Sequence, residues 1–414
     1  MRLSFKRLVI SVVIGTILLS YTYKRQRSAV QEYSSSSSKP VSMVSRSNNT
    51  AAATKYRDHK EENTLTKIIN HKQQGHHNDV RLPWSIRRTR YLPNFYTQKH
   101  ANETKHYSDS TIVYLHHNKA AGTTTKNCLI SLATSTKRRI GTLLSSQGRT
   151  ALDRSWKSQP NRLKAHIYMG GYAFGVCNYL TYKPCSYFTI LRDPYERLIS
   201  SYSYCRRARR DQICSALGAN NVSIREWALH QGSFFFQQLL FDPAFCTSHF
   251  MKNRTLMAMG GIAHDIVGSD RIYAAPCWFR QKVIMHNALT NNQSEMLLNF
   301  CLENLERWFA VIGLVEEYDT SLALLQGVYN VPFKKCATGT AINKSNYLNL
   351  HPMEKTTKND TNAARKETLK QLKLELQRDP LVSKALSADV RLYKKAQEIF
   401  ERQKRTYRER FGQL

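Results

Sequence analysis

Blocks of apolar and polar positions alternate along most of the chain, and their spacing predicts its elements. Short apolar runs rich in β-branched residues are typical of buried strands; one begins at Thr111, a second runs into a glycine turn within 166–174, and others cover 186–191 and 309–314. Apolar positions at helical spacing predict helices over 124–132, 195–206, 224–231, 294–308 and 318–329, followed by a charged helical end over 366–411 that Pro380 interrupts. Strands that alternate with helices predict the α/β class, with a mostly parallel central sheet flanked by helices.

The N-terminal region has a different pattern. Residues 8–23 form an uncharged run after a short basic segment, just short of the roughly 17–25 residues that span a bilayer. No small-residue cleavage site follows, which favours an uncleaved signal anchor over a removed signal peptide. Residues 24–108 are polar and predict a flexible stem, whose aromatic piece 81–96 is expected to pack onto the domain edge. We therefore expect a cytoplasmic tail (1–7), a transmembrane anchor (8–23), a luminal stem (24–108) and a globular domain (109–414) with a charged helical end from about 360.

Glycosylation sequons and cysteines indicate the compartment. The sequons begin at Asn48, Asn102, Asn221, Asn253, Asn292, Asn343 and Asn359. As a set they favour a luminal location, and nine cysteines without a C-x-x-C pair favour disulfides over a zinc site. Close spacing suggests pairs Cys177–Cys185 and Cys205–Cys214, and the odd count leaves one cysteine unpaired. The sequence thus predicts a single-pass type II membrane protein of the secretory route, and it is compatible with a homodimer.

The net charge of the protein indicates which kind of molecule it binds. Sixty-two Lys and Arg against thirty Asp and Glu give a formal charge of +32, which attracts polyanions such as nucleic acid, an anionic membrane or an acidic polysaccharide. A luminal location removes most of the case for nucleic acid, and no RNA-binding aromatic signature or zinc-finger spacing is present. A glycan partner fits both observations, while a basic protein without a polyanionic partner is the plainer alternative.

Residues 111–126 have the layout of an anion-binding loop. An apolar run ends near a lysine, small residues leave the backbone amides bare, and threonines open a helix whose first N–H groups can point at a phosphate or sulfate. The lysine precedes the small residues, so the Walker motif G-x-x-x-x-G-K-[ST] is absent. A tight strand-to-helix turn without a ligand is the alternative. The residues expected to hold the anion are Lys119, Ala120, Ala121, Gly122, Thr123 and Thr124.

A second anion element follows the third apolar run. Asp193, a proline at the first helical position and Glu196 three residues after the cap predict a helix that starts with a capping box. Arg192 lies just outside this start and Ser200 about two turns along the helix, so a guanidinium and a hydroxyl are placed to bind a phosphate group. Alone, the pattern also fits a capped helix with surface ion pairs. Together with the Lys119 loop it predicts a nucleotide phosphorylated at both ends, bound at the carboxyl ends of the strands.

The two elements together resemble those of the Golgi carbohydrate sulfotransferases, in particular the branch with the heparan sulfate 2-O- and 6-O-sulfotransferases. Residues 117–124 resemble the loop that holds the 5′-phosphosulfate of 3′-phosphoadenosine 5′-phosphosulfate, and residues 191–200 resemble the element that holds its 3′-phosphate. Residues 312–317 resemble the family's later strand, and Lys344 and Ser345 match its donor-binding loop. The resemblance covers roughly 111–347. It implies a P-loop-like nucleotide-binding fold and sulfuryl transfer to a glycan hydroxyl, on a glycosaminoglycan or related polysaccharide, at the Golgi membrane.

The reaction that this resemblance implies assigns roles to particular side chains. Negative charge builds on the bridging oxygen of the leaving nucleotide, and Lys119 is expected to neutralise it without a metal. The acceptor hydroxyl needs a general base, for which related enzymes carry a histidine where this chain has Gly171. The remaining candidates are His116, His117, His166 and His230. His117 is the first choice because it is close to Lys119.

Two other functions remain open. Glycine at the expected base position also fits a catalytically weak or inactive sulfotransferase-like protein that binds nucleotide or an anionic glycan. A nucleotide kinase of related fold is disfavoured by the missing Walker lysine position and by the luminal location.

Overall fold

The computed structural model of the protein describes residues 91–97, 104–143, 145, 165–180, 183–208, 211, 213–214, 217–241, 281–282, 289, 291–336 and 362–413. All of them belong to one compact unit. The predicted tail and anchor, most of the stem, and the loop with Lys344 and Ser345 lie outside the described residues. Among the helices that are described, none is long and apolar enough to cross a membrane.

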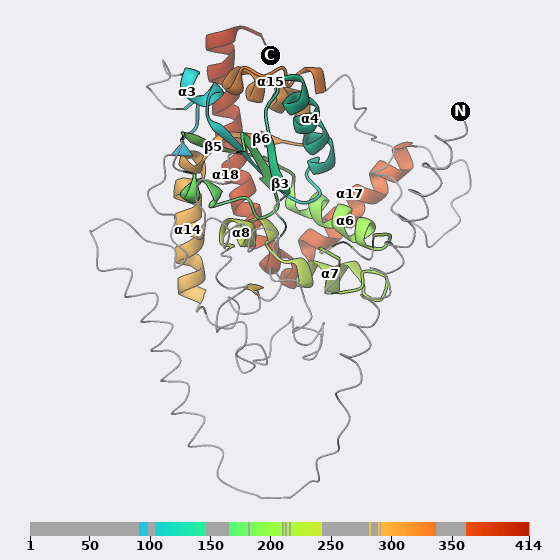
Figure 1. Ribbon diagram of the computed structural model, residues 1–414. Coiled ribbons are helices and arrows are strands. Elements are labelled where there is room, and N and C mark those ends of the chain that lie inside the picture. Colours follow the sequence, from blue (N-terminus) through green and yellow to red (C-terminus); the bar gives the residue numbers. More distant parts are fainter. Residues whose placement is uncertain are drawn as a thin grey trace, which may run out of the picture. The chain divides into compact units, whose positions relative to one another are not determined.

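A six-stranded sheet in which every pairing is parallel forms the centre of the fold, which confirms the predicted α/β class (Figure 1). The strands are β1 (Tyr91–Leu92), β2 (Thr111–Leu115), β3 (Ile140–Leu143), β4 (Ile167–Gly170), β5 (Cys185–Leu191) and β6 (Phe309–Leu314). Their order is β1-β5-β2-β4-β3, and β6 also pairs with β5. Because β2 occupies one side of β5, β1 and β6 lie end to end along its other side.

The strands differ from the prediction in length and number. Neither β1, with two residues, nor β3, in a basic segment, has the apolar run that would have predicted it. The predicted strand that runs into a glycine turn over 166–174 is confirmed: β4 ends at Gly170, and the chain turns with positive φ at Gly170 and Gly175 and enters the 3₁₀ helix η1 (Val176–Tyr179). Glycine reaches such φ values without the steric cost that other residues incur.

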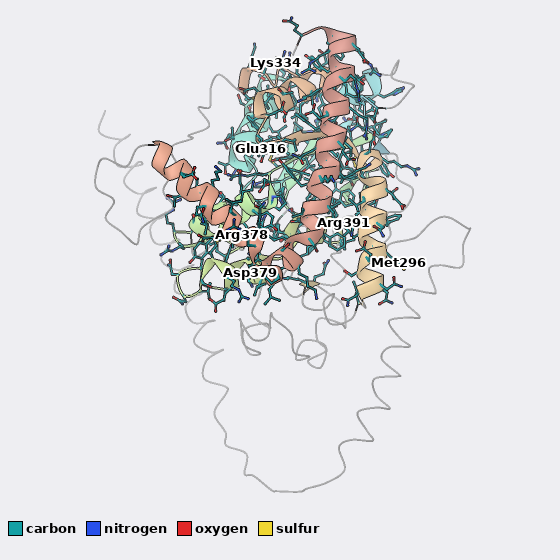
Figure 2. The ribbon with its side chains drawn as sticks, turned by 180° about the vertical axis from the view of Figure 1, so that it is seen from behind. Met296, Glu316, Lys334, Arg378, Asp379 and Arg391 are labelled. Carbon is teal, nitrogen blue, oxygen red and sulfur yellow. A yellow bond between two sulfur atoms is a disulfide. The ribbon has the colours of Figure 1, made fainter. Side chains whose placement is uncertain are left out.

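Helices cover the sheet and extend past it. They are α3 (Thr104–Ser108), α4 (Gly122–Ser135), α6 (Pro194–Cys205), α7 (Ile224–Gln231), α8 (Phe234–Leu239), α14 (Asn291–Trp308), α15 (Tyr318–Tyr329), α17 (Asn362–Arg378) and α18 (Pro380–Phe411). The predicted interruption at Pro380 is confirmed: Asp379 caps α18 through the N–H groups of Leu381 and Val382, at the junction with α17 that Figure 2 shows. Proline fits this first turn because its missing N–H has no intrahelical partner there.

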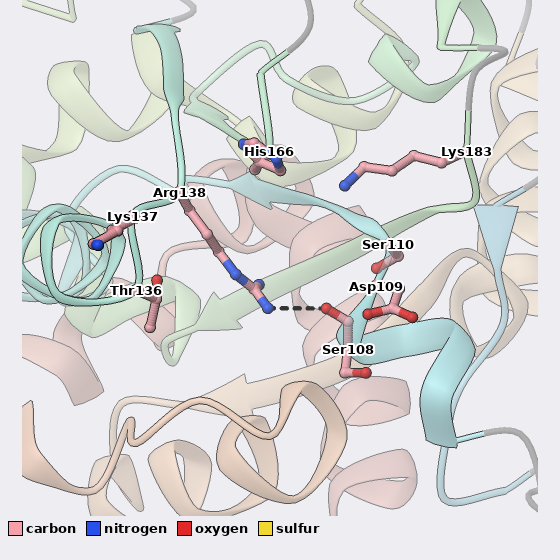
Figure 3. A pocket seen from close by; sticks show the side chains of 8 residues that line it. All are labelled: Ser108, Asp109, Ser110, Thr136, Lys137, Arg138, His166 and Lys183. Atoms are coloured by element: carbon pink, nitrogen blue, oxygen red, sulfur yellow. Dashed lines mark hydrogen bonds between the residues drawn. The ribbon is translucent and has the colours of Figure 1, made fainter.

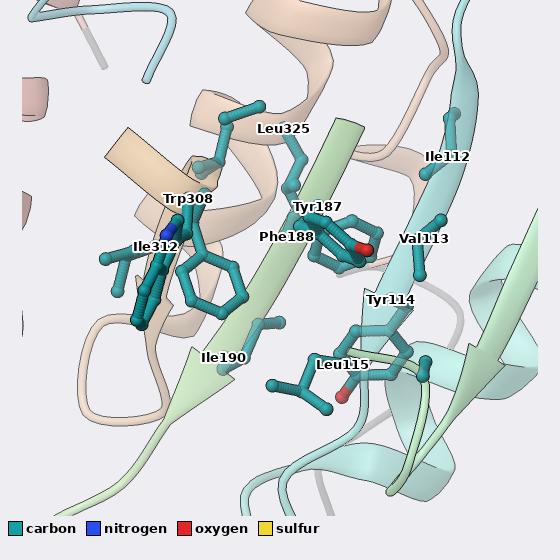
Figure 4. Packing of buried hydrophobic residues seen from close by; sticks show 14 of the residues in the cluster. Ile112, Val113, Tyr114, Leu115, Tyr187, Phe188, Ile190, Trp308, Ile312 and Leu325 are labelled. Carbon is teal, nitrogen blue, oxygen red and sulfur yellow. The ribbon is translucent and has the colours of Figure 1, made fainter. Parts of the chain in front are cut away.

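The core lies against the sheet and is closed by α18. Aromatic and aliphatic side chains of β2, β5 and β6 interdigitate in it, and the rings of Tyr114 and Phe188 stack at 4.7 Å across paired strands (Figure 4). The helix α18 packs on β6, α14 and α15. From it Gln403 bonds both the N–H and the carbonyl of Ile312 and also accepts from Asn94, so that it satisfies the edge of β6 and fixes the segment 91–97. That segment buries Phe95 within the core.

Disulfides tie the loops to this frame. The predicted pairs Cys177–Cys185 and Cys205–Cys214 are confirmed. A third pair, Cys128–Cys336, joins α4 to the turn after α15 across 208 residues, a separation that no spacing argument could have found. Disulfides persist in oxidising compartments.

Candidate functional site

The loop between β2 and α4 forms a cradle of bare backbone. Lys119 and Ala121 have positive φ, 68° and 54°, and Ala121 caps α4 without any side-chain hydrogen bond. The first N–H groups of a helix have no intrahelical acceptor, so those at the start of α4 remain available to an anion. A larger residue at 122 would displace the His116 ring, since a Cβ on Gly122 would lie 1.6 Å from its Nε2. The helix begins at Gly122, two residues before the predicted Thr124.

Lys119 is held over an aromatic ring. Its Nζ lies 3.9 Å from the ring centroid of Tyr204, whose hydroxyl donates a hydrogen bond of 2.7 Å to Oδ2 of Asp211. Such a cation–π contact favours the charged form of the lysine and restrains its position. Burial, followed by the charges of Arg192 and Arg207, nevertheless lowers the pKa of Lys119 to about 8.

The second anion element starts α6 at the carboxyl end of β5. Asp193 caps the helix by accepting from the N–H groups of Tyr195 (3.1 Å) and Glu196 (3.0 Å). The predicted capping box is wrong, because Glu316 rather than Glu196 accepts the N–H of Asp193, at 2.9 Å. The Glu196 carboxylate instead binds Nη2 of Arg192 at 3.2 Å and lies 3.5 Å from Nζ of Lys373 on α17.

The structure brings these two predicted elements together. β2 and β5 are neighbouring parallel strands, with Leu115 opposite Thr189, so the loops that follow them emerge at the same edge of the sheet. The effect of Arg192 on the pKa of Lys119 reflects this proximity. Ser200 lies on α6 and is partly exposed. Lys344 and Ser345 belong to the part of the chain that is not described, so their predicted contact with the donor stays a prediction.

His117 lies inside the protein rather than at the mouth of the loop. It is 2% exposed, its ring meets Phe235 edge to face at 5.2 Å, and its Nδ1 shares a 2.6 Å hydrogen bond with Oε1 of Gln238. Burial, followed by the charge of Arg197, lowers its pKa to about 3, which keeps the imidazole neutral. A general base has to reach the acceptor hydroxyl, and this burial disfavours His117 for that role.

The other histidines have different surroundings. His116 packs against Gly122 and is partly exposed, and burial together with the charges of Lys126 and Lys119 lowers its pKa to about 4. His166 lies at the opposite end of β4, where Nδ1 accepts the N–H of Arg139 at 3.0 Å. His230 is buried in α7, and burial lowers its pKa well below the ordinary value.

Three further side chains shape this region; the sequence did not suggest Gln238 or Tyr204, whereas Arg197 belongs to the resembling stretch 191–200. Gln238 on α8 donates to the carbonyls of His116 (3.1 Å) and Gly171 (2.7 Å), and so connects the loop to the turn after β4. Tyr204 restrains Lys119 through its ring. The only sequence feature that could have pointed to Tyr204 is that it directly precedes Cys205, a member of a predicted disulfide. Arg197 is fully buried, and its guanidinium nitrogens have no hydrogen-bond partner within the described residues.

The structure thus places a lysine loop and an arginine element at the carboxyl edge of a parallel sheet in an α/β protein. The family model for the sulfotransferase family matches residues 104–396, which include both elements and most of α18. The chain therefore belongs to the sulfotransferase family, whose members transfer sulfuryl groups. No curated protein matches it.

Proposed function

We propose that the protein transfers a sulfuryl group from 3′-phosphoadenosine 5′-phosphosulfate to a hydroxyl of a glycan, in particular of an acidic polysaccharide. The observation that carries the proposal is the meeting of the Lys119 loop and the Arg192 element at one edge of the sheet. A simple triphosphate site would need only one such element. Two of them, on neighbouring strands, suit a nucleotide with anionic groups at both ends.

In this proposal the first turn of α4 holds the 5′ end of the donor. The N–H groups that follow Ala121 bind the phosphosulfate oxygens, Thr123 and Thr124 add hydroxyl donors, and the dipole of α4 favours the negative charge. Arg192 and Ser200 bind the 3′-phosphate, for which Arg192 has to exchange its bond with Glu196. This fixed geometry holds the donor in line for attack.

Lys119 acts on the leaving group. As the acceptor oxygen bonds to sulfur, the bond from sulfur to the bridging phosphate oxygen breaks and that oxygen gains charge. The Lys119 ammonium, restrained by Tyr204, neutralises it. The proton of the acceptor hydroxyl passes to a base. Both His116 and His117 stay neutral at pH 7, and His116 is better placed because it is partly exposed whereas His117 is buried.

The experiment is transfer of labelled sulfate from the donor to a panel of desulfated glycosaminoglycans and neutral glycans. We expect transfer to at least one acceptor and its loss in Lys119→Ala. The charge-matched control is Lys394→Ala, an exposed lysine on α18, which should keep wild-type activity. Donor binding without transfer to any acceptor would refute the proposed reaction.

A protein that binds nucleotide without turnover is the second candidate, favoured by Gly171. The space that a side chain at 171 would enter is taken by Gln238, whose Nε2 lies 3.2 Å from the position of a Cβ. This candidate predicts that adenosine 3′,5′-bisphosphate raises the melting temperature while no acceptor is sulfated.

For the compartment we propose the Golgi membrane, with a type II orientation and a luminal domain. The three disulfides support an oxidising compartment, and the charge of +32 supports an acidic glycan as partner over a neutral one. Protease protection of a tagged protein in intact microsomes tests the orientation.

A further inference from the structure

A second group of basic side chains lies at the opposite edge of the sheet from Lys119. A cavity of about 280 Å³ opens there, before the amino ends of β2, β4 and β5 and beside the end of α4 (Figure 3). Lys137, Arg138, His166 and Lys183 line it, and Asp109 is the only carboxylate among its described lining residues. Lys and Arg residues thus outnumber acidic residues by three to one in this lining, although the Lys137 side chain points away from the pocket (Figure 3).

The end of α4 is shaped to place Arg138 in this pocket. The backbone N–H of Arg138 donates to the carbonyl of Ala133 at 2.8 Å, and Lys137 has a φ of 54°, as in a Schellman turn. Lysine is uncommon in this left-handed conformation, which usually selects glycine. The turn directs the Arg138 side chain back over the sheet edge, where Nη2 donates to the carbonyl of Ser108 at 2.9 Å (Figure 3).

Among the described lining residues, one carboxylate, Asp109, offsets only part of the positive charge of the pocket. Burial and then the charge of Arg138 lower the pKa of Lys183, and the lowering by Arg138 is larger than the opposite effect of Asp109. Burial and then Lys183 lower the pKa of His166. The Nη1 atom of Arg138 is buried, and no hydrogen-bond partner for it exists among the residues that the structure describes. An anion in the pocket would both neutralise this field and accept from Nη1.

We propose that this pocket binds a sulfate ester of an acidic polysaccharide, as a docking site separate from the donor loop. The pocket consists of residues that the donor site does not use, whereas the identity of this polysaccharide with the acceptor rests on the proposed function. The five-residue strand β2 spans about 17 Å, so a chain that occupies both edges must be longer than this. The site thereby selects extended acceptors over short ones.

The test measures the affinity of the full chain for heparin, as a sulfated polysaccharide probe, at fixed ionic strength. The variants are Lys183→Gln, Arg138→Gln and the exposed control Lys394→Gln, which removes the same charge from α18. We expect each pocket variant to weaken binding by roughly tenfold, the usual effect of losing a hydrogen bond to a charged group, and the control to change it little. Stabilisation by adenosine 3′,5′-bisphosphate should stay at the wild-type level in all three, which also shows that they are folded.

Three results would overturn the proposal. If the pocket variants bind heparin as tightly as the wild type, the pocket is not a heparin-binding site. If the control variant loses as much heparin affinity as the pocket variants, binding depends on the overall positive charge of the protein and not on this pocket. If inorganic sulfate protects the wild type alone against thermal unfolding while heparin binding is unchanged in the variants, the pocket takes a small free anion instead. None of these measurements needs turnover, so they show whether the pocket binds the polysaccharide even if the protein sulfates no acceptor.

Discussion

Replacing Lys119 by alanine is the most direct perturbation of the proposed reaction. The side chain follows β2 and lies 3.9 Å from the ring centroid of Tyr204. The cradle itself is made of main-chain groups from Ala121 onward. The variant should therefore keep the donor site and lose the charge beside the leaving oxygen.

The expected size of the effect follows from the role of that charge. Removing one preorganised group that stabilises developing negative charge costs on the order of 10²–10³ in kcat. The affinity for adenosine 3′,5′-bisphosphate should fall much less, because Arg192 and the α4 amides remain. A loss of affinity as large as the loss of rate would assign Lys119 to ground-state binding.

The pH dependence tests the same role independently. Only the protonated lysine neutralises the leaving oxygen, so kcat/KM for the donor should fall as pH rises through about 8, the pKa of Lys119. Arg207→Gln removes a like charge and should move this descending limb to higher pH, while Asp211→Asn removes an attractive charge and should move it lower. Two charges about 10 Å apart at a dielectric constant of about 80 interact by about 0.4 kcal/mol, or roughly 0.3 pH unit in each direction.

Initial rates of labelled-sulfate transfer between pH 6 and 10, with thermal unfolding of each variant as a control for folding, provide the measurement. The reasoning is refuted if Lys119→Ala keeps a kcat within about threefold of the wild type. Shifts of the alkaline limb in the same direction for Arg207→Gln and Asp211→Asn would show that another group titrates there.

Two further predictions concern affinity and stability. Glu196→Gln removes the carboxylate that occupies Arg192, so adenosine 3′,5′-bisphosphate should bind roughly two- to fivefold tighter by calorimetry, and weaker binding would contradict the exchange of partners. Cys336→Ser opens the Cys128–Cys336 disulfide, whose cysteines are 208 residues apart, and should lower the free energy of unfolding by about 2–5 kcal/mol in denaturant titrations, with an unchanged value contradicting a structural role.

The sequence was sufficient to predict those strands and loops whose structure is determined by neighbouring residues in the chain. The apolar runs of β2, β5 and β6 are buried along their whole length, so composition alone identified them. The loop at Lys119 and the helix start at Arg192 are each defined within about ten residues, and the rule that parallel strands place ligands at their carboxyl ends predicted that they meet.

The contacts that complete the site were out of reach because they join distant parts of the chain. Gln238 lies 121 residues from its partner His117, and the short helix α8 that carries it, FFFQQL, has no helical spacing of apolar positions. The same holds for Glu316, which lies 123 residues from Asp193 in the sequence. Its carboxylate accepts the hydrogen bond from the N–H of Asp193 that Glu196 was predicted to accept. Local capping rules could not show that a tertiary partner would compete.

The turn at Gly171 shows how one such contact bears on function. A Cβ at 171 would approach Nε2 of Gln238 to 3.2 Å, closer than usual, so Gly171→Ala should push the Gln238 amide away from the carbonyls of Gly171 and His116. Gln238→Ala removes the same bonds and leaves the buried Nδ1 of His117 unpaired, which should cost about 1–3 kcal/mol of stability.

Because both substitutions act on one set of hydrogen bonds, the double variant should lose less stability than the sum of the single variants, by more than about 0.5 kcal/mol. Chemical denaturation of the four proteins measures this coupling. Strictly additive losses would mean that Gln238 and the turn are independent, and that the space beside Gly171 is free for a catalytic side chain from elsewhere. Coupling would mean instead that glycine at 171 is the consequence of Gln238, and that the proton acceptor has to come from the loop side of the site.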